Sequence, residues 1–392
     1  MIVSKPISRT RYDVCIVHLA DARFYPFFHR QAQALVEKGY RVALVSWEGR
    51  RGQGDPAWPG IDTYPITIEA GSIRGKIFFL RYFFSLLAVL LRLKARLYEA
   101  VDPPALVPAR IAAGLHRARY NYFSLEYFQG VDQLVAKPVM RRVWFMLERL
   151  GIAQAQNVAA VCNTTERFLR RDYGLSHTAT ILNVPNGSDY AAAPDGRLRR
   201  LLGIPADLPL VIYKGEIAEN RGLLPLVCAM EPLSPLHFAL VGAGEYKETL
   251  RSEAARRGLS DRVHFADPVT SDEFVYYLKD AQLGQVIHET RGINMTVTLP
   301  SKLFDYVNAG IPVIASDGPE ISRVVREWKL GWVVSPSSVE SIRAALAEFL
   351  AVFPELAAYR ANCRAAAERF CWENEKKIYV DFMEKAMKGT PR

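Results

Sequence analysis

The sequence predicts an α/β protein with two doubly wound, Rossmann-like domains that face each other across a cleft. Short apolar strands alternate with amphipathic helices along nearly the whole chain, which is typical of parallel sheets covered by helices on both faces. The alternation stops once, over 185–208, where Pro, Gly, Asp and Arg gather without a sustained period, and then starts again. With 392 residues, the chain is long enough for each half to bury its own core.

The composition is that of a soluble globular protein, since half of the residues are apolar and 23% are charged. The formal net charge of +9 favours anionic partners, such as nucleotides or an acidic membrane surface. The basic residues are dispersed and no nucleic-acid reading motif stands out, so we expect no nucleic-acid partner.

Cysteine usage and the N-terminus both predict a cytoplasmic protein. Five cysteines are scattered without CxxC or Cys/His spacing, so we expect reduced core residues and neither a disulfide framework nor a zinc site. Residues 1–13 lack the continuous apolar region of a signal peptide.

The first half contains the elements of one parallel sheet. In chain order we expect strand 12–19, helix 26–38, strand 41–47, strand 119–125, helix 138–150, strand 157–162, helix 164–172 and strand 179–184. Ligands bind at the carboxyl ends of strands in such sheets, so His18, Asp21 and Asp102 are secondary candidates for site residues.

The most hydrophobic part of the chain, 76–97, is expected to form one helix. Its uncharged run, 82–91, is about half of what a membrane span needs, and basic residues flank it. Two interpretations stay open: a core helix under the sheet, or an aromatic, basic segment that docks on an anionic bilayer. The second would make the protein peripheral on the cytoplasmic face of the membrane.

The second half repeats the alternation of strands and helices. In chain order we expect strand 210–213, helix 223–231, strand 237–241, helix 246–257, strand 262–265, helix 271–279, strand 283–288, a helix and a strand within 299–320, helix 321–328, strand 331–334 and two or three closing helices.

The stretch 299–320 carries the strongest chemical signal. Ser301 suits a helix cap, and helical spacing places Ser301, Asp305 and Asn308 on one polar face. A helix N-terminus with Ser301 and Lys302 can hold a phosphate, and Asp305, one turn on, can accept hydrogen bonds from both ribose hydroxyls. This arrangement fits a nucleotide, and a capped surface helix with an exposed lysine is the alternative.

The segment LPSKLFDYVNAGIPVIAS, 299–316, resembles the donor-nucleotide motif of the GT-B-fold glycosyltransferases of family 4 (glycosyl transferases group 1), which often reads PxKLFEYMAAGxPVIAS. The resemblance implies that Asp305 binds the ribose of a nucleotide sugar and that Ser301 and Lys302 lie near its diphosphate. Asp stands where the family usually has Glu, a difference of one methylene.

A second segment, YKGEIAENRG at 213–222, resembles the family's GRxxxxKG motif, whose Arg and Lys contact the donor diphosphate. The resemblance carries Gly215 and Arg221 over to this chain. Glu216 stands at the first basic position, and Lys214 is the nearest replacement for the missing charge.

The turn VGAGE places Gly242 and Gly244 after a strand and before a helix. As a nicotinamide fingerprint it fails, because Lys247 occupies the place of the third glycine. In the resembling family this turn approaches the nucleotide, and the alternative is a tight turn that needs glycine for its own backbone.

The family usually places a second acid eight residues before the ribose-binding residue, where it meets the donor sugar, and that position is Val297 here. The nearest acid is Glu289, in the loop 288–298 that also contains Arg291 and Asn294. We therefore expect the donor-sugar contacts to be redistributed onto this loop, with Asn294 as a contact residue.

On the acceptor side, YNYFSLEYF at 120–128 resembles the family's YDxHELF segment, with Leu125 in the His position and Glu126 retained. The resemblance implies that Glu126 acts as a base or orients the acceptor hydroxyl, and a salt-bridged loop glutamate is the alternative. No metal-ligand spacing such as HExxH or DxD is present, so Arg221, Lys302 and helix dipoles would meet the charge of the leaving diphosphate without a metal.

These features predict a retaining glycosyltransferase that moves a sugar from a nucleotide-diphosphate donor to a glycan or lipid-linked glycan of a cell-envelope or polysaccharide pathway, with no cofactor. We expect an acceptor-binding domain at 1–190, a donor-binding domain at 191–370 and a helix at 371–392 that crosses back to the first domain. Two alternatives stay open: a catalytically silent GT-B scaffold that binds a membrane or a partner protein, and a GT-B sugar epimerase.

Overall fold

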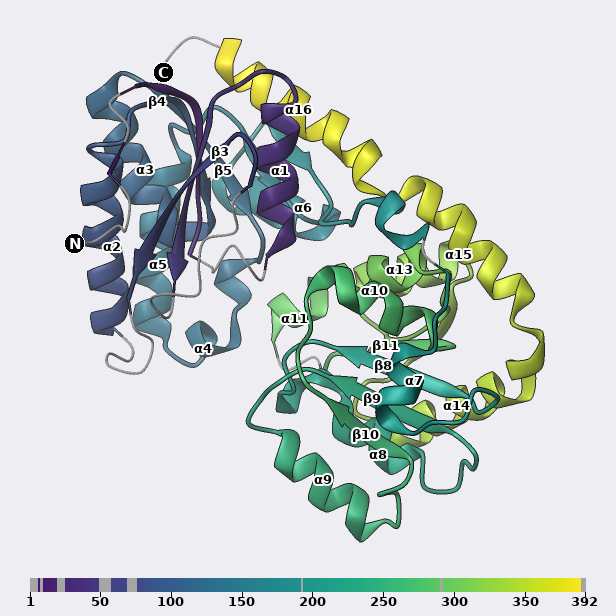
Figure 1. Cartoon of the computed structure of the whole chain (residues 1–392). Coiled ribbons are helices and arrows are strands. Elements are labelled where there is room, and N and C mark those ends of the chain that lie inside the picture. The colour runs from purple at the N-terminus through teal and green to yellow at the C-terminus, as the bar shows by residue number, and fades with distance from the viewer. Residues whose placement is uncertain are drawn as a thin grey trace. The chain divides into compact units, whose positions relative to one another are not determined.

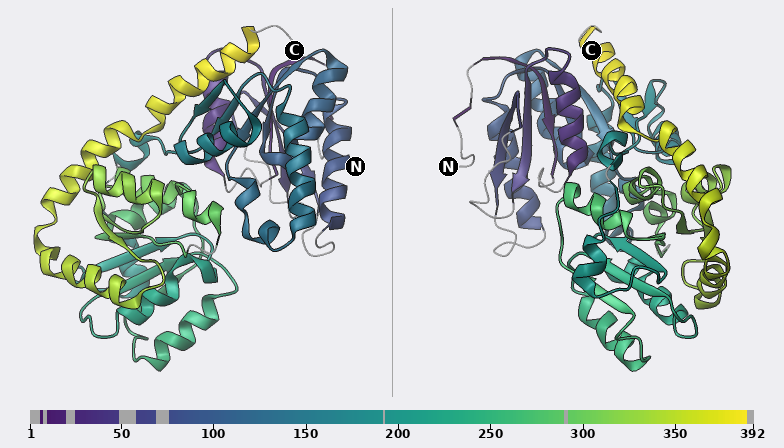
Figure 2. Two further views of the ribbon diagram at one scale, coloured as in Figure 1. Left: turned by 180° about the vertical axis from the view of Figure 1, so that it is seen from behind. Right: turned by 45° about the vertical axis from the view of Figure 1, so that its right-hand side comes forward.

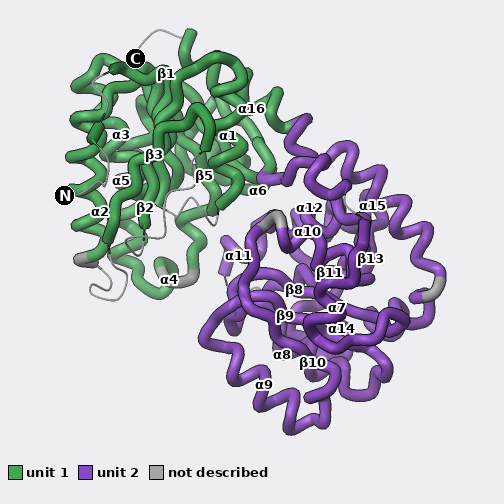
Figure 3. Tube along the Cα trace, in the orientation of Figure 1, with its two compact units in different colours: residues 1–182, 375–392 green, residues 183–374 purple. Residues whose placement is uncertain are grey.

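The chain folds into two compact units (Figures 1 and 3). The structure is a computed structural model that describes residues 6–7, 10–19, 25–48, 58–68, 76–191, 193–289 and 292–388. Unit 1 comprises Met1–Leu182 and Glu375–Arg392, and unit 2 comprises Asn183–Asn374, against boundaries of 190 and 370 expected from the sequence. Asp21 and Arg291 lie outside the described residues.

Unit 1 is built on a parallel sheet of seven strands within the described ranges, in the order β3-β2-β1-β4-β5-β6-β7. The strands are β1 Tyr12–Val17, β2 Val42–Glu48, β3 Ile61–Thr67, β4 Ala95–Val101, β5 Arg119–Ser124, β6 Val158–Ala160 and β7 Thr178–Thr180. The order reverses between β1 and β4, and the crevice at such a switch point is where doubly wound sheets bind ligands.

The helices of unit 1 cover both faces of this sheet (Figure 2). They are α1 Pro26–Val36, α2 Lys76–Leu90, α3 Asp102–His116, α4 Asp132–Val135, α5 Pro138–Ile152, α6 Asn163–Tyr173 and α16 Trp372–Lys388, which enters the unit at Glu375. Alternate residues of β4 serve opposite faces: Tyr98 and Ala100 belong to the core under α2 and α3, whereas Glu99 points to α16.

The single helix expected over 76–97 is wrong in its second part. Helix α2 ends at Leu90, and the chain then enters β4, a central strand that pairs with β1 and β5. The expectation failed because an apolar run without a period is compatible with a buried strand as well as a helix. In the described ranges, no helix combines the length and the apolar character needed to cross a membrane.

Unit 2 repeats the architecture with six parallel strands in its described part, in the order β10-β9-β8-β11-β12-β13. The strands are β8 Leu210–Lys214, β9 His237–Val241, β10 Val263–Ala266, β11 Leu283–Val286, β12 Val313–Ser316 and β13 Gly331–Val334. The helices are α7 Arg197–Leu202, α8 Leu223–Ala229, α9 Lys247–Arg256, α10 Ser271–Lys279, α11 Ile293–Val297, α12 Ser301–Asn308, α13 Pro319–Glu327, α14 Val339–Val352 and α15 Ala357–Arg369. The predicted class of two doubly wound domains is confirmed.

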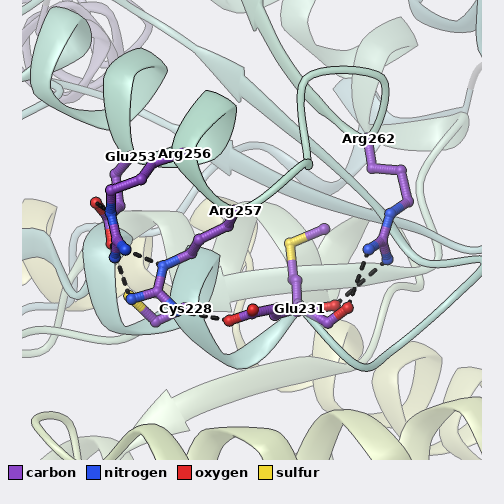
Figure 4. Close-up of polar contacts among 7 residues, drawn as sticks. Cys228, Glu231, Glu253, Arg256, Arg257 and Arg262 are labelled. Atoms are coloured by element: carbon purple, nitrogen blue, oxygen red, sulfur yellow. Dashed lines mark hydrogen bonds and ion pairs between the residues drawn. The ribbon is translucent and has the colours of Figure 1, made fainter.

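Charged side chains join α8 to α9 at one edge of unit 2 (Figure 4). Glu253 on α9 accepts hydrogen bonds from Arg256 and Arg257, which lower its pKa to about 2. Arg257 also reaches Glu231 after α8 at 2.7 Å, and Arg262 donates to the backbone oxygens of Leu233 and Glu231. These pairs lie at the surface, so they connect the two helices without contributing to the buried core.

Helix α16 is held on unit 1 by a buried carboxyl group. The Tyr379 hydroxyl donates to Glu99 Oε2 at 2.5 Å, Asn157 donates to the Phe382 backbone oxygen at 2.9 Å, and both contacts bring α16 onto the sheet. Burial raises the pKa of Glu99 to about 8, although the hydrogen bond from Tyr379 acts in the opposite direction. Glu99 is therefore largely protonated at neutral pH.

This carboxyl group should make the stability of unit 1 depend on pH. Because the pKa of Glu99 is higher in the folded than in the unfolded chain, its contribution is complete below the unfolded value and is lost as pH rises through about 8. We expect the free energy of unfolding of the wild type, relative to that of Glu99→Gln, to fall between pH 5 and pH 9 by an amount on the order of a few kcal/mol, measured by urea unfolding at each pH.

The control is Glu355→Gln, which removes an exposed carboxylate and should follow the wild type across the same range. A constant difference between the wild type and Glu99→Gln at every pH would show that Glu99 is already ionised in the folded protein.

Candidate functional site

The candidate site lies in unit 2, where the carboxyl ends of β8, β9 and β11 meet the N-terminus of α12. The sheet order reverses between β8 and β11, so this is the switch point of the second sheet. The site residues predicted in this unit come from four separate segments of the chain, and only the fold brings them together.

Three predicted glycines allow the turns after β8 and β9 to touch through their backbones. A Cβ atom on Gly242 would lie 1.9 Å from the Gly215 oxygen, and one on Gly244 would lie 2.1 Å from the Ile217 oxygen. Hydrogen bonds from Gly215 to Val241 and from Ile217 to Ala243 close the same contact. This contact between two turns accounts for glycine at both positions of VGAGE, and an approach of the turn to a nucleotide stays a prediction.

Positive side chains gather beside these turns. The Lys302 ammonium lies over the Tyr213 ring, 4.2 Å from its centroid, and Arg221 Nη1 is 3.4 Å from His288 Nδ1. Arg221 also reaches the exposed Glu216 at 3.4 Å. Arg221 Nε and His288 Nε2 are buried without a hydrogen-bond partner among the described residues, which an anionic ligand could supply.

The electrostatics of this cluster fit an anion. Burial, together with the charge of Arg221, lowers the pKa of Lys302 to about 7, while Asp305 opposes the shift. Burial and the charge of Lys302 lower the pKa of His288 well below its ordinary value, so its imidazole is neutral at pH 7. A bound diphosphate would relieve the repulsion between Lys302 and Arg221.

Helix α12 presents only part of the polar face expected for it. Ser301 is the first helical residue and does not cap the helix, because Pro300 takes the cap position and no side chain bonds there. The Asp305 carboxylate accepts a hydrogen bond from Tyr190 at 2.8 Å, which orients it. The Asn308 side-chain amide is used within the protein, since its Nδ2 donates hydrogen bonds to the Phe370 and Phe304 backbone oxygens.

The loop before α12 contains the residues expected near the donor sugar. Asn294 is buried on α11, Val297 is buried at the end of that helix, and Glu289 is half-buried after β11. Glu289 joins the turn before α8 through a hydrogen bond from its backbone N–H to the Asn220 oxygen. The described residues of both units contain no group of three or more His, Cys, Asp or Glu side chains that could hold a metal ion.

The acceptor-side candidate, Glu126, lies in unit 1 and is exposed at the carboxyl end of β5. Beside it, Asp102 begins α3 with a φ of +59°, a backbone conformation that non-glycine residues rarely adopt. Asp102 Oδ1 accepts the Leu125 N–H at 2.9 Å. Burial raises the pKa of Asp102 well above its ordinary value, and the negative charge of Glu126 adds to the shift.

Sequence reasoning missed two residues of the unit 2 site. His288 lies two residues after β11, a position that could have marked it as a cleft residue, whereas Tyr190 lies in the aperiodic 185–208 stretch and gave no signal. Tyr190 reaches Asp305 only through the tertiary fold.

Two family models match the chain, one in each half. The glycosyl transferase 4-like domain matches residues 26–187, and the model for glycosyl transferases group 1 matches residues 196–369. Together they span most of both units.

Among curated proteins, the chain is similar to a GDP-mannose-dependent alpha-(1-6)-phosphatidylinositol monomannoside mannosyltransferase of Mycolicibacterium smegmatis. The identity is 27% over 237 residues, which is 57% of this chain and 62% of that protein. It is also similar to the putative colanic acid biosynthesis glycosyl transferase WcaI of Escherichia coli, with 26% identity over 52% of this chain and 51% of that protein. The matched part thus spans between half and two thirds of these relatives.

Solved structures show the same fold over nearly the whole chain. Sucrose-phosphate synthase from Thermosynechococcus elongatus superposes with a TM-score of 0.75 at 19% identity, covering 96% of this chain and 99% of that one. Anabaena Alr3699/HepE in complex with UDP-glucose superposes with a TM-score of 0.74 at 17% identity, covering 95% and 100%.

Lys302 should make nucleotide binding depend on pH. Because its pKa is about 7 without ligand, the ammonium loses its proton as pH rises, and a diphosphate then loses one positive partner. We expect the affinity for a nucleoside diphosphate to fall about tenfold between pH 7 and pH 9, consistent with one charge-assisted hydrogen bond.

Lys302→Arg keeps its charge over this range and should give a flatter profile by calorimetry. Titration in two buffers of different ionisation enthalpy should also reveal proton uptake by the wild type on binding. Parallel pH profiles for the two proteins would contradict the assignment of Lys302 to the diphosphate.

Proposed function

Because the chain belongs to the glycosyl transferases group 1 proteins of family 4 and has the GT-B fold, we propose that it is a glycosyltransferase that uses a nucleoside-diphosphate sugar as donor. The observation that carries the proposal is the cluster of Arg221, His288 and Lys302, together with Asp305 one turn after Lys302 on α12. Such a cluster can neutralise a diphosphate while the carboxylate accepts hydrogen bonds from a ribose.

In the proposed reaction, unit 2 binds the donor. Arg221, Lys302 and the N–H groups at the start of α12 stabilise the charge that develops on the leaving diphosphate, so the proposal assigns no role to a metal ion. The neutral His288 can donate or accept a hydrogen bond without adding charge.

Unit 1 binds the acceptor in this proposal. Glu126 accepts or orients the proton of the acceptor hydroxyl, and the neighbouring Asp102, whose pKa is raised, assists in holding that hydroxyl.

We propose transfer with retention of configuration, as the family resemblance implied, and NMR of the anomeric centre in the product tests it.

We propose a lipid-linked glycan of the cell envelope as the acceptor. Support comes from relatives named as a phosphatidylinositol monomannoside mannosyltransferase, a colanic acid biosynthesis glycosyl transferase and a lipopolysaccharide core biosynthesis glycosyltransferase. Turnover with a panel of UDP, GDP, ADP and dTDP sugars would identify the base and the sugar of the donor.

A catalytically silent scaffold is the second candidate. Val297 stands where the family usually has an acid, and Glu216 stands where it usually has a basic residue. A scaffold would bind nucleotides weakly or not at all, so donor turnover separates the two functions.

Asp305 should control nucleotide affinity. Asp305→Ala removes a charged acceptor for the ribose hydroxyls, so we expect binding of the preferred nucleotide to weaken about 10- to 100-fold by calorimetry. Tyr190→Phe keeps the carboxylate but loses the hydrogen bond that orients it, and should have a smaller effect.

The matched control is Asp317→Ala, an exposed carboxylate in the same unit that pairs with Arg326. If none of the four nucleotides binds the wild type at millimolar concentration, the transferase proposal fails and the scaffold takes its place.

Glu126 should control turnover and leave donor binding unchanged. Glu126→Gln removes a proton acceptor from unit 1, so we expect kcat to fall about 10²- to 10⁴-fold with the same nucleotide affinity. Glu37→Gln, a surface change in the same unit, should retain activity. Wild-type turnover in Glu126→Gln would show that this residue is an ordinary loop glutamate.

A further inference from the structure

Exposed large apolar side chains are concentrated on one face of unit 1. Helices α2, α3 and α5 pack side by side on the sheet (Figures 1 and 2), with α3 in contact with both of the others. Most of the exposed large apolar side chains in the described residues lie on these helices or directly beside them, namely Phe79, Leu80, Phe84, Leu91, Ile111, Leu115, Val135, Val139, Val143, Met146 and Leu150.

On α2 the exposed residues form a regular stripe. Leu80 and Phe84, and Leu91 directly after the helix, follow helical spacing, and Phe84 is 63% exposed. The opposite side of the same helix already supplies the core with Tyr82 and Leu86. The outer stripe is thus additional to what the fold needs.

Helix α5 carries a second stripe of the same kind. Val139, Val143, Met146 and Leu150 are spaced by four, three and four residues, and Val139 is 78% exposed. A helix-spaced apolar stripe normally packs against a core, and here it is open to solvent.

Helix α3 fills the space between the two stripes. Ile111 and Leu115 lie one turn apart on it, and Leu115 is 67% exposed. The Phe79 and Trp144 rings, 5.8 Å apart, join α2 to α5 directly. We call this continuous surface, formed by the exposed apolar residues of α2, α3 and α5, the apolar face.

The charged side chains of the three helices and their flanks are mainly basic. Exposed basic residues lie on or next to the three helices: Arg81, Arg92, Lys94, Arg117, Lys137, Arg142 and Arg149. Within the bounds of α2, α3 and α5 the acidic residues are Asp102, at the start of α3, and Glu148, which is buried. A surface that combines exposed apolar side chains with basic ones is complementary to an anionic bilayer, where apolar side chains enter the acyl region and cations meet the headgroups.

We propose that the apolar face docks unit 1 on the surface of an anionic phospholipid membrane. The surface is wider than the 76–97 segment considered from the sequence, because it uses α3 and α5 as well as α2, while 95–101 belongs to the sheet. The proposal rests on the proposed function only for its purpose, which is to bring unit 1 to a lipid-linked acceptor. The docking itself depends on neither nucleotide nor turnover.

The test is sedimentation of the full chain with vesicles of phosphatidylcholine, with and without phosphatidylglycerol, at low and high salt. We expect binding to the vesicles that contain phosphatidylglycerol, weaker binding to phosphatidylcholine alone, and a loss at high salt. Binding to neither kind of vesicle, or equal binding to both, would overturn the proposal.

Two variants separate the apolar and basic contributions. Phe84→Ser with Val143→Ser removes apolar side chains from both stripes, and Arg142→Glu with Arg149→Glu reverses charge beside them. Each pair should lower the vesicle partition coefficient at least about tenfold. The changed side chains are exposed, so the thermal midpoint should stay close to that of the wild type.

Matched controls lie on unit 2. Leu201→Ser removes an apolar side chain that is also exposed, and Arg360→Glu with Arg364→Glu reverses two exposed charges on α15. These controls should bind vesicles as the wild type does, and an equal loss in them would overturn the assignment to the apolar face.

Light scattering distinguishes a membrane from a second copy of the chain. If the wild type forms a dimer and does not bind vesicles, and if Phe84→Ser with Val143→Ser abolishes that dimer, the apolar face joins two copies instead. Nucleotide binding of the same variants by calorimetry reports on the proposed function separately, so failure of either proposal leaves the other measurable.

Discussion

The backbone contact between the turns after β8 and β9 is the constraint on which the candidate site depends. Gly242 and Gly244 lie so close to the Gly215 and Ile217 oxygens that no side chain fits at either position. Because these turns touch, the strand ends bring Tyr213 and Lys302 together beside the start of α12. A side chain at either glycine would separate the turns and shift Arg221, which follows the first of them, relative to Lys302 on α12.

The basic cluster itself is unfavourable without a ligand. Burial and mutual repulsion lower the pKa of Lys302, and His288 stays neutral in the same surroundings. The Tyr213 ring and Asp305 offset part of this cost, through a cation–π contact and an opposite charge. Groups with shifted pKa values are frequently found at functional sites. In this cluster, a bound anion would offset the repulsion between the buried positive charges.

The two faces of the unit 1 sheet have different tasks. One face receives α16, which is held by a protonated Glu99 and by Tyr379, so the C-terminal segment is part of this unit although unit 2 separates it from the rest in sequence. The other face carries α2, α3 and α5, whose inner sides form the core and whose outer sides stay apolar. The two interpretations of α2, a core helix and a surface-docking helix, are therefore compatible, because one side of the helix packs in the core and the other side is exposed and apolar.

The sequence by itself determined the fold class and pointed to most residues of the candidate site in unit 2, since strand and helix periods and the motif at 299–316 are local properties of the chain. It did not separate α2 from β4, because an apolar run without a period suits either element. Only the tertiary structure decided that Tyr190 orients Asp305, that Asn308 bonds the Phe370 backbone, and that three helices form one apolar face. These features depend on contacts between residues far apart in sequence, and no local pattern of residues encodes such contacts.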